Sequence, residues 1–382
     1  MSLNLVKHEL MEDGIKSELS FPPKLKEIAK KIYEDFPKLC PIDESRAGFV
    51  YVYPHDRADG DAYGSAFALT LVFQKLGIKT IPIFSEPVNP NFKAASEEIP
   101  KRLVRYEGEK ELAFRRAKRE EVVAFYVDCS SPKRVLGRQF LLEPAKHFYA
   151  IDHHIAEEEV PDTYWIEPEA AATCEMLTLF FLYLEQLSRQ KLIDARVANF
   201  LYAGFLTDSN RFSYDDVSES TFILASILRA RGAEIRRLSS ELFDLRSPAE
   251  ARAISWLYRT MQSHFNGCFH YAFLSKAEME LLELKDRDLE VLPALLRDIE
   301  GVQIAVLVRE SKLGTLRANV RSFSPVSARD LAASFGGGGH ELAAGFSVTP
   351  VDREGFEVAL FERVQKQLEL AGYSCSEVEE EA

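Results

Sequence analysis

The sequence has little that would form disulfide bonds, a zinc knuckle or a membrane span. Its five cysteines are widely separated, and no two of them form a Cys-x-x-Cys pair. Scattered cysteines in odd number favour free thiols in a reducing compartment. The longest apolar run, residues 176–184, is about half of the ~18 residues that a membrane span needs. Residues 1–16 mix charges and lack the apolar core of a signal peptide. We therefore expect a cytoplasmic protein without membrane contact.

The sequence also lacks an excess of positive charge. Lys and Arg number 47 against 60 Asp and Glu, which gives a net charge of −13. A protein that coats long nucleic acid usually presents a broad basic surface, so long duplex DNA is not an expected partner. A small phosphate-bearing substrate needs only a few local cations and is compatible with this composition. Part of the acidity is expected to belong to metal-binding residues.

The length and the pattern of apolar segments predict more than one domain. At about 150 residues per domain, 382 residues suggest two or three units. Short apolar strands alternate with helical segments in the first part, which predicts an α/β fold with a doubly wound, mainly parallel sheet. A helical linker would join it to a smaller α/β domain. The expected segments are an N-terminal helical extension (1–45), the first domain (46–235), the linker (236–264), the second domain (265–372) and an acidic tail (373–382).

Individual elements follow from the periodicity of apolar residues. In the first domain, strands are expected over 49–53, 78–84, 122–127 and 147–151. Helices are expected over 24–36, 61–76, 109–119, 132–142, 171–187 and 195–206. In the second domain, strands are expected over 268–274, 302–309, 314–321 and 345–348, and helices over 329–335 and 354–371.

Three polar residues follow the strand expected at 147–151. Asp152, His153 and His154 emerge at its C-terminal end, which is where open α/β sheets bind ligands. Adjacent histidines after a carboxylate are poor core residues and good ligands for first-row metals. This triplet is the strongest indication of chemistry in the chain.

A second polar cluster joins the first strand to the helix after it. His55, Asp59 and Asp61 lie within seven residues of one another. Gly60 and Gly64 would permit a tight turn and a close approach of the backbone. One carboxylate alone would most simply cap the helix. His55 together with both carboxylates favours a site.

Two further acids end secondary-structure elements. Asp128 follows strand 122–127, and Asp208 follows helix 195–206; either one alone would be an ordinary cap. If all four clusters share one edge of the sheet, their carboxylates lie too close together without cations. Mixed His and Asp ligands suit a divalent ion such as Mn²⁺. Two ions that share one Asp would form a site that activates water for displacement at phosphorus.

Taken in order, these motifs resemble the DHH phosphoesterase superfamily, which is named for the triplet at 152–154. The pattern His-x-x-x-Asp-x-Asp-Ala-x-Gly-Ser from His55, then Asp128, the triplet and Asp208, occur in the order of that family. Residues 335–345, Phe-Gly-Gly-Gly-Gly-His-Glu-Leu-Ala-Ala-Gly, resemble the signature of the DHH-associated C-terminal domain. The resemblance covers about residues 49–348. Length and architecture are most similar to the bacterial oligoribonuclease (nanoRNase)/pAp phosphatase group.

The resemblance implies roles for the matching residues. Two divalent ions, Mn²⁺ with Mg²⁺ or Co²⁺ as alternatives, would bind two overlapping sets of ligands. The first set is His55, Asp59 and Asp128. The second set, with Asp128 as the bridge, is Asp61, Asp128, His153 and Asp208. Catalysis would depend on Asp61, Asp128 and His154, with His154 close to the ions or the scissile phosphate, and Asp152 would orient the histidines.

The second domain would bind the substrate from across a cleft between the domains, which would hold the active site. The residues that would cradle a phosphate or sugar are Gly337, Gly338, Gly339 and His340. Arg321 ends a strand before this loop, and a matching arginine in the short-oligonucleotide group binds a terminal phosphate. The planar guanidinium suits that task because it can contact two oxygens at once. The alternatives are a solvated strand-end charge for Arg321 and a flexible turn for the glycines.

The implied function is hydrolysis of short oligoribonucleotides to mononucleotides, and with it of 3′-phosphoadenosine 5′-phosphate (pAp) to AMP. Partners would be short RNA or small nucleotides, and a homodimer is left open. Alternatives are a RecJ-like single-strand exonuclease and a phosphodiesterase of linear or cyclic dinucleotides. A non-catalytic nucleotide sensor is less favoured, because every candidate ligand is retained. Two positions depart from the family: Ala58 replaces a frequent Pro, and Asn210 replaces a frequent Gly.

Overall fold

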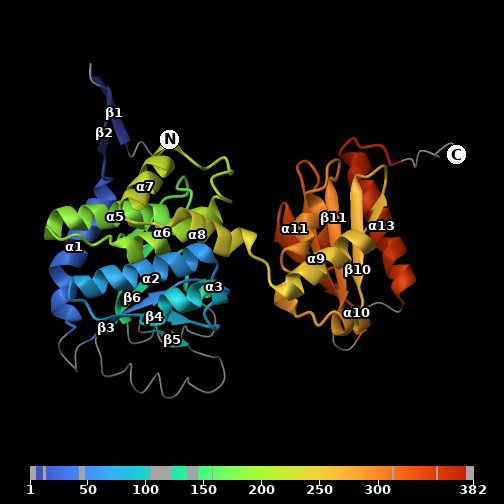
Figure 1. The fold of residues 1–382 in the computed structure, drawn as a ribbon, viewed down its shortest axis with the longest axis horizontal. Coiled ribbons are helices and arrows are strands. Elements are labelled where there is room, and N and C mark those ends of the chain that lie inside the picture. Colours follow the sequence, from blue (N-terminus) through green and yellow to red (C-terminus); the bar gives the residue numbers. More distant parts are fainter. Residues whose placement is uncertain are drawn as a thin grey trace. The chain divides into compact units, whose positions relative to one another are not determined.

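The computed structural model describes residues 6–11, 14–42, 48–99, 101–103, 122–135, 145–156, 158–311, 314–349 and 352–375. The chain forms two compact units, Met1–Leu245 and Arg246–Ala382, which we call the N-terminal and the C-terminal unit (Figure 1). The division falls inside the segment that was expected to be a linker. Each unit is described by itself, and the expected cleft between them stays a prediction.

A parallel sheet forms the centre of the N-terminal unit. Among the described residues, six strands are hydrogen-bonded in the order β5-β4-β3-β6-β7-β8, and every neighbouring pair is parallel. The strands are β3 (Phe49–Tyr53), β4 (Thr80–Phe84), β5 (Arg102–Leu103), β6 (Val122–Val127), β7 (Ala145–Asp152) and β8 (Tyr164–Ile166). The chain runs outward from β3 in one direction and from β6 in the other. Ligands bind at the carboxyl ends of strands where the order reverses in this way, so the ends of β3 and β6 are the place to look for a site.

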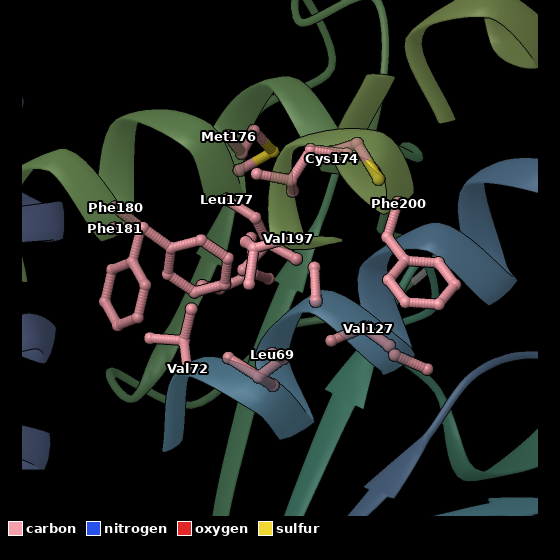
Figure 2. Close-up of a cluster of buried hydrophobic side chains, with 14 of the residues drawn as sticks. Leu69, Val72, Val127, Cys174, Met176, Leu177, Phe180, Phe181, Val197 and Phe200 are labelled. Atoms are coloured by element: carbon pink, nitrogen blue, oxygen red, sulfur yellow. The ribbon is translucent and has the colours of Figure 1, made fainter. Parts of the chain in front are cut away.

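Four helices pack together beside this sheet. They are α1 (Pro23–Leu39), α2 (Gly60–Lys75), α5 (Thr173–Ser188) and α6 (Ala195–Asp208). Figure 2 shows Leu69 of α2, Leu177 and Phe181 of α5 and Val197 of α6 in one buried cluster. Helix α5 is buried along most of its length, which explains why the longest apolar run of the sequence lies there. The predicted α/β fold with a doubly wound, mainly parallel sheet is confirmed.

Some expected elements differ in detail. Within the expected helical extension, strands β1 (Val6–Met11) and β2 (Gly14–Leu19) form an antiparallel hairpin before α1. Helix α1 itself packs in the core of the N-terminal unit, where Leu25 and Ile32 are fully buried. Two short strands, β5 and β8, were missed because two or three residues give no clear periodicity. The helix expected over 109–119 and most of that over 132–142 lie outside the described residues; a 3₁₀ turn covers Pro132–Arg134.

Several shorter helices complete the described part of the N-terminal unit. They are α3 (Pro90–Lys93), α7 (Glu219–Ala230), α8 (Ile235–Ser239) and a π-helical turn over Ser240–Asp244. Among the described residues, no helix combines the length and the apolar character that crossing a membrane would need. The cysteines of the described residues form no disulfide bond.

The C-terminal unit is built on a mixed sheet. The strand order is β13-β14-β12-β11-β10-β9, and only β10 and β11 are parallel among the described pairs. The strands are β9 (Gln262–His264), β10 (Phe269–Leu274), β11 (Ile304–Glu310), β12 (Leu316–Ser322), β13 (Gly338–His340) and β14 (Ala343–Val348). The helices are α9 (Pro248–Thr260), α10 (Lys276–Leu281), α11 (Leu292–Arg297), α12 (Ala328–Ala333) and α13 (Arg353–Leu370). The predicted smaller α/β domain is confirmed.

Helix α9 belongs to the core of the C-terminal unit, although its residues were expected in the linker. Ala253, Trp256 and Leu257 are buried in one cluster with residues of α11 and of the sheet. A second cluster lies with α12 and α13 and includes Val320 of β12. The sheet therefore has a core on each face. The acidic tail, residues 376–382, lies outside the described residues.

Glycines allow α2 and α6 to approach each other closely. A Cβ atom at Gly64 would lie 2.4 Å from the carbonyl oxygen of Phe200. A Cβ atom at Gly204 would lie 2.3 Å from Cys174 Sγ and 2.4 Å from Asp61 Oδ1. Gly64 lies within α2, so the close approach expected there is present and the tight turn is not.

We predict that Gly64→Ala lowers the free energy of unfolding by about 2 kcal/mol or more, because a backbone carbonyl cannot move aside for the added methyl group. Urea unfolding followed by circular dichroism measures the change. Gly355→Ala in the first turn of α13 is the matched control, since its nearest neighbour is the side-chain oxygen Asp352 Oδ1 at 3.1 Å. Equal effects of the two substitutions would refute the close-contact explanation.

Candidate metal centre

Acidic and histidine side chains converge at the carboxyl end of the parallel sheet. The residues come from the ends of β3, β6 and β7, the first turn of α2 and the last residue of α6. They are His55, Asp59, Asp61, Asp128, His153, His154 and Asp208. The place is the reversal of strand order between β3 and β6, where a ligand site was expected from the topology.

The possible ligand atoms form three overlapping groups, and within each group all of them lie within 4.8 Å of one another. The groups are His55, Asp59 and Asp128; Asp61, Asp128, His153 and Asp208; and Asp128, His153 and His154. The first two groups have the same members as the two ligand sets that the resemblance implied. Asp128 belongs to all three. The structure thus brings together every residue that was expected to hold a metal ion.

Asp128 is placed to face both sets. It is fully buried, and its φ of 57° is in the left-handed region, which Asp tolerates better than most residues. Its backbone N–H donates to Ile151 O at 3.2 Å, which fixes the end of β6 against β7. One carboxylate oxygen, Oδ2, lies 3.2 Å from His55 Nε2, and the other, Oδ1, lies 3.5 Å from His153 Nε2. A carboxylate that bridges two metal ions must direct one oxygen toward each ligand set, as the two oxygens of Asp128 do.

The two inner histidines direct Nε2 toward carboxylates. His55 Nδ1 lies 2.7 Å from Asp56 O, and His153 Nδ1 lies 3.0 Å from Ala170 O. A nitrogen next to a carbonyl oxygen carries the proton, so in the neutral ring Nε2 offers a lone pair. For His153 that lone pair would face Asp208 Oδ2 at 3.0 Å. Two acceptors face each other in this way only if a proton or a metal ion lies between them.

The electrostatics of the cluster favour bound cations. Burial lowers the pKa of His55, but hydrogen bonds and charge from Asp128 and Asp59 outweigh it and raise the pKa to about 10. Burial also lowers the pKa of His153, but nearby carboxylates, chiefly Asp208, raise this pKa to about 10. Burial and nearby carboxylates raise the pKa of Asp208 to about 6 and that of Asp61 well above its usual value. A cluster that holds protons so tightly has an excess of negative charge that a divalent cation can neutralise.

The donor atoms fit a hard or borderline divalent ion. All three groups consist of carboxylate oxygens and imidazole nitrogens, which suit Mn²⁺, Mg²⁺ or Co²⁺ better than a thiolate-preferring metal. Cys174 lies next to Asp61 but belongs to none of the groups. Its Sγ instead faces the backbone oxygen of Asp61 at 3.8 Å.

The residues that orient the acids were not predicted from the sequence. The N–H groups of Thr173 and Cys174 donate to the two oxygens of Asp61 at 2.6 and 2.9 Å. The Thr173 hydroxyl donates to Asp128 Oδ1 at 3.1 Å. The first N–H groups of a helix lack partners within it, so Asp61 of α2 caps α5 from outside. The polar Thr173 before a long apolar run could have located this helix start, but not its distance from Asp61.

A buried carboxylate stabilises the same helix start. Glu175 accepts a hydrogen bond from Ala171 N at 3.0 Å and from the Thr221 hydroxyl of α7 at 3.1 Å. Burial raises the pKa of Glu175 to about 7. The adjacent Ala170 carbonyl contacts His153. The segment 170–175 therefore orients two members of the second ligand set, His153 and Asp61.

Two alternatives from the sequence are resolved by geometry. Asp59 does both things that were considered for it: Oδ1 caps α2 by accepting from Ala62 N at 3.0 Å, and Oδ2 lies 3.5 Å from His55 Nε2. Asp152 accepts from the backbone N–H of His154 at 3.1 Å and contacts its Nδ1 at 2.8 Å. Asp152 therefore orients His154 alone, and the expectation that it also orients His153 is corrected, because Ala170 has that role.

The departure at Asn210 has a structural explanation. After Asp208, three consecutive residues have positive φ: Asn210 at 44°, Arg211 at 60° and Phe212 at 63°. Asn adopts this conformation more readily than most residues other than Gly. Replacement of the frequent Gly by Asn thus keeps the backbone that follows Asp208.

The expected substrate residues lie on or next to neighbouring strands at one end of the strand order of the C-terminal sheet, β13-β14-β12. Arg321 of β12 is opposite Ala343 of β14, which is opposite His340 of β13. Directly opposed residues share a face, so Arg321 and His340 project from the same side. Gly338 and Gly339 belong to the edge strand β13, whereas Gly337 lies just before it. Gly339 has a φ of 146°, and a Cβ atom there would lie 2.6 Å from Ala344 Cα.

Comparison with known proteins identifies the class. Residues 49–205 match the DHH family, N-terminal domain, and residues 271–368 match the DHHA1 domain. The first match contains the motifs at His55, Asp128 and Asp152, with Asp208 just beyond its end, and the second match contains the glycine strand. The chain belongs to the DHH family.

Particular relatives are similar over most of their length. A bifunctional oligoribonuclease and PAP phosphatase NrnA from Thermus thermophilus is 26% identical over 334 residues, which is 85% of this chain and 92% of that protein. The protein of the same name from Bacillus subtilis is 26% identical over 330 residues, 84% of this chain and 96% of that one. A solved exopolyphosphatase-related protein from Bacteroides fragilis has the same fold, with a TM-score of 0.78 at 20% identity over 91% of this chain and 97% of that chain.

We predict that Mn²⁺ raises the melting temperature of the wild-type protein and that Asp128→Ala abolishes this increase. An ion that binds only the folded state stabilises it by about 2.7 kcal/mol at one hundred times its Kd. Scanning calorimetry of chelator-treated protein, with and without Mn²⁺, and metal content by mass spectrometry measure the effect. Asp56→Ala is the control, since Asp56 belongs to none of the three groups. Wild-type metal content in Asp128→Ala would rule out a bridging role.

We also predict that Thr173→Val weakens metal binding about tenfold, because residues that orient metal ligands typically contribute 10–100-fold in affinity. Thr173→Ser, which keeps the hydroxyl group, should restore it. Isothermal titration with Mn²⁺ measures both variants. An unchanged affinity in Thr173→Val would show that the hydroxyl group only packs at the start of α5.

Proposed function

We propose that this protein is a metal-dependent phosphoesterase that hydrolyses short oligoribonucleotides to mononucleotides and pAp to AMP. The observation that carries the proposal is the convergence of two ligand sets on the buried Asp128. The names of the relatives, which are similar along most of the chain, support the choice of substrates. The native ion in this proposal is Mn²⁺, with Mg²⁺ or Co²⁺ as alternatives.

The residues of the N-terminal unit divide the chemistry among them. Two divalent ions would supply activation of water and charge stabilisation for in-line displacement at phosphorus. The residues that would hold them are His55, Asp59, Asp61, Asp128, His153 and Asp208. Asp152 fixes the ring of His154 through Nδ1. When the ring carries a proton on both nitrogens, Nε2 can donate a hydrogen bond to the phosphate or a proton to the leaving oxygen. His154 is 40% exposed at its side chain, so a substrate can reach it.

The C-terminal unit would recognise the substrate. In this proposal Arg321 binds a terminal phosphate, and Gly337, Gly338, Gly339 and His340 contact the phosphate or sugar. The glycine strand supports the assignment, because residues without side chains let a ligand approach the backbone closely. Its three residues from Gly338 to His340 are all exposed, so the backbone is accessible.

The same proposal covers location and partners. The net charge of −13 and the free thiols of the described cysteines fit a cytoplasmic enzyme of small nucleotides. Long duplex DNA and membranes are not partners in it. A homodimer remains an assembly to be tested by light scattering.

We predict that the enzyme with Mn²⁺ releases product fastest from the shortest RNAs in a matched panel. The panel contains a dinucleotide, a five-nucleotide RNA, a long single-stranded DNA and pAp, and chromatography of the products measures each rate. Rates that fall with RNA length, together with release of phosphate from pAp, would support the proposal.

Other outcomes would lead to the alternatives. A preference for long DNA would favour a RecJ-like exonuclease, and turnover of the dinucleotide alone would favour a dinucleotide phosphodiesterase. No turnover of any substrate, with nucleotide binding retained, would favour a sensor. The variant Asp128→Ala serves as the inactive control throughout.

A further inference from the structure

Arg321 is a half-buried cation without an acidic partner. Among the described residues, no carboxylate pairs with it, and its Nη1 donates to the neighbouring Val320 O at 3.0 Å. Burial and the charge of Arg297 both lower the pKa of Arg321. Arg297 is paired with Asp298, so one positive charge is left without a carboxylate partner among the described residues, which favours an anion beside Arg321.

The guanidinium group of Arg297 also contacts an exposed aromatic ring. Its Nε donates to Asp298 Oδ1 at 2.7 Å, and its guanidinium carbon lies 4.7 Å from the centre of the Phe323 ring. Phe323 is 42% exposed. An aromatic ring in a cation–π contact on one side, with much of its surface open, is suited to stacking with a second planar group.

The strand geometry places Phe323 and Arg321 on one face. The N–H of Phe323 donates to Gln303 O at 2.9 Å, which extends the pairing of β12 with β11 beyond Ser322 and Ile304. Side chains two positions apart therefore point the same way, about 7 Å apart along the strand. The intervening Ser322 is fully buried on the other side.

We propose that Arg321, Arg297 and Phe323 form a subsite for one nucleoside monophosphate unit, with the terminal phosphate on the two arginines and the base on Phe323. The spacing from Arg321 to Phe323 is comparable to the distance from the phosphate of a nucleotide to its base. Stacking accepts any base, because every base has a π-face. The subsite rests on the proposed function and adds how an enzyme of short RNA would hold an end nucleotide without reading sequence.

The test compares ligands with and without a base. Calorimetric titration of the full chain, treated with a chelator so that no turnover occurs, measures the affinity for AMP and for ribose 5-phosphate. We predict that Phe323→Leu lowers the affinity for AMP about tenfold, within the range for one stacked base, and leaves ribose 5-phosphate unchanged. Phe323→Trp should keep the affinity for AMP. Arg297→Gln should lower the affinity for both ligands.

Arg317→Gln is the matched control for charge. Arg317 lies on the same strand and face as Arg321, four positions away, and is 3.9 Å from Asp286. It should change neither affinity. If it lowered both as much as Arg297→Gln does, the effect would be general electrostatic attraction and the subsite would be refuted. A loss of fold would lower both affinities in Phe323→Leu, so only a loss specific to AMP supports the stacking role.

The two proposals can fail separately. Turnover of short RNA, with AMP binding that does not depend on Phe323, would leave the function and refute the subsite. AMP binding that depends on Phe323, without hydrolysis of any substrate in the panel, would leave the subsite and refute the function. Wild-type protein that binds ribose 5-phosphate as tightly as AMP would also refute the subsite.

Discussion

Crowded negative charge at the end of a parallel sheet is the constraint on which the rest of the N-terminal unit depends. Burial, together with the closeness of Asp61, Asp128 and Asp208 to one another, raises the pKa of Asp61 and Asp208. An ordinary core would not retain them, since buried carboxylates without cations are unfavourable. The surrounding elements stabilise these carboxylates. N–H groups at the start of α5 donate hydrogen bonds to Asp61, the Thr173 hydroxyl group donates to Asp128, and histidines lie between the acids.

Much of this site could be predicted from the sequence, because it depends on local rules. Strand ends followed by Asp or His are visible as motifs, and parallel strands bring such ends to one edge. The resemblance then divided the residues into two sets, and the groups in the structure have the same members. The fold class followed from the alternation of strands and helices along the chain. Strand β3 was predicted over the same residues that form it in the structure.

The remainder depends on contacts between distant segments, which periodicity does not encode. Nothing near Asp61 in the sequence indicates that Thr173 and Cys174 lie within hydrogen-bonding distance of it. Short edge strands such as β8 are set by pairing with a neighbour and not by their own pattern. Helix α9 reads as a linker because its apolar stripe is narrow, and only its packing on the C-terminal unit shows where it belongs.

The close contact of α2 with α6 has a consequence for motion. These helices carry Asp61 and Asp208, and their backbones touch where glycines leave no space for a side chain. Elements packed in this way open only with the whole core, as slow amide exchange would report. Asp59, by contrast, stands exposed at the junction of a loop and a helix. The cluster therefore joins acids that are held between packed helices to one acid, Asp59, that is open to solvent, so small adjustments of the site to its contents are expected first at Asp59.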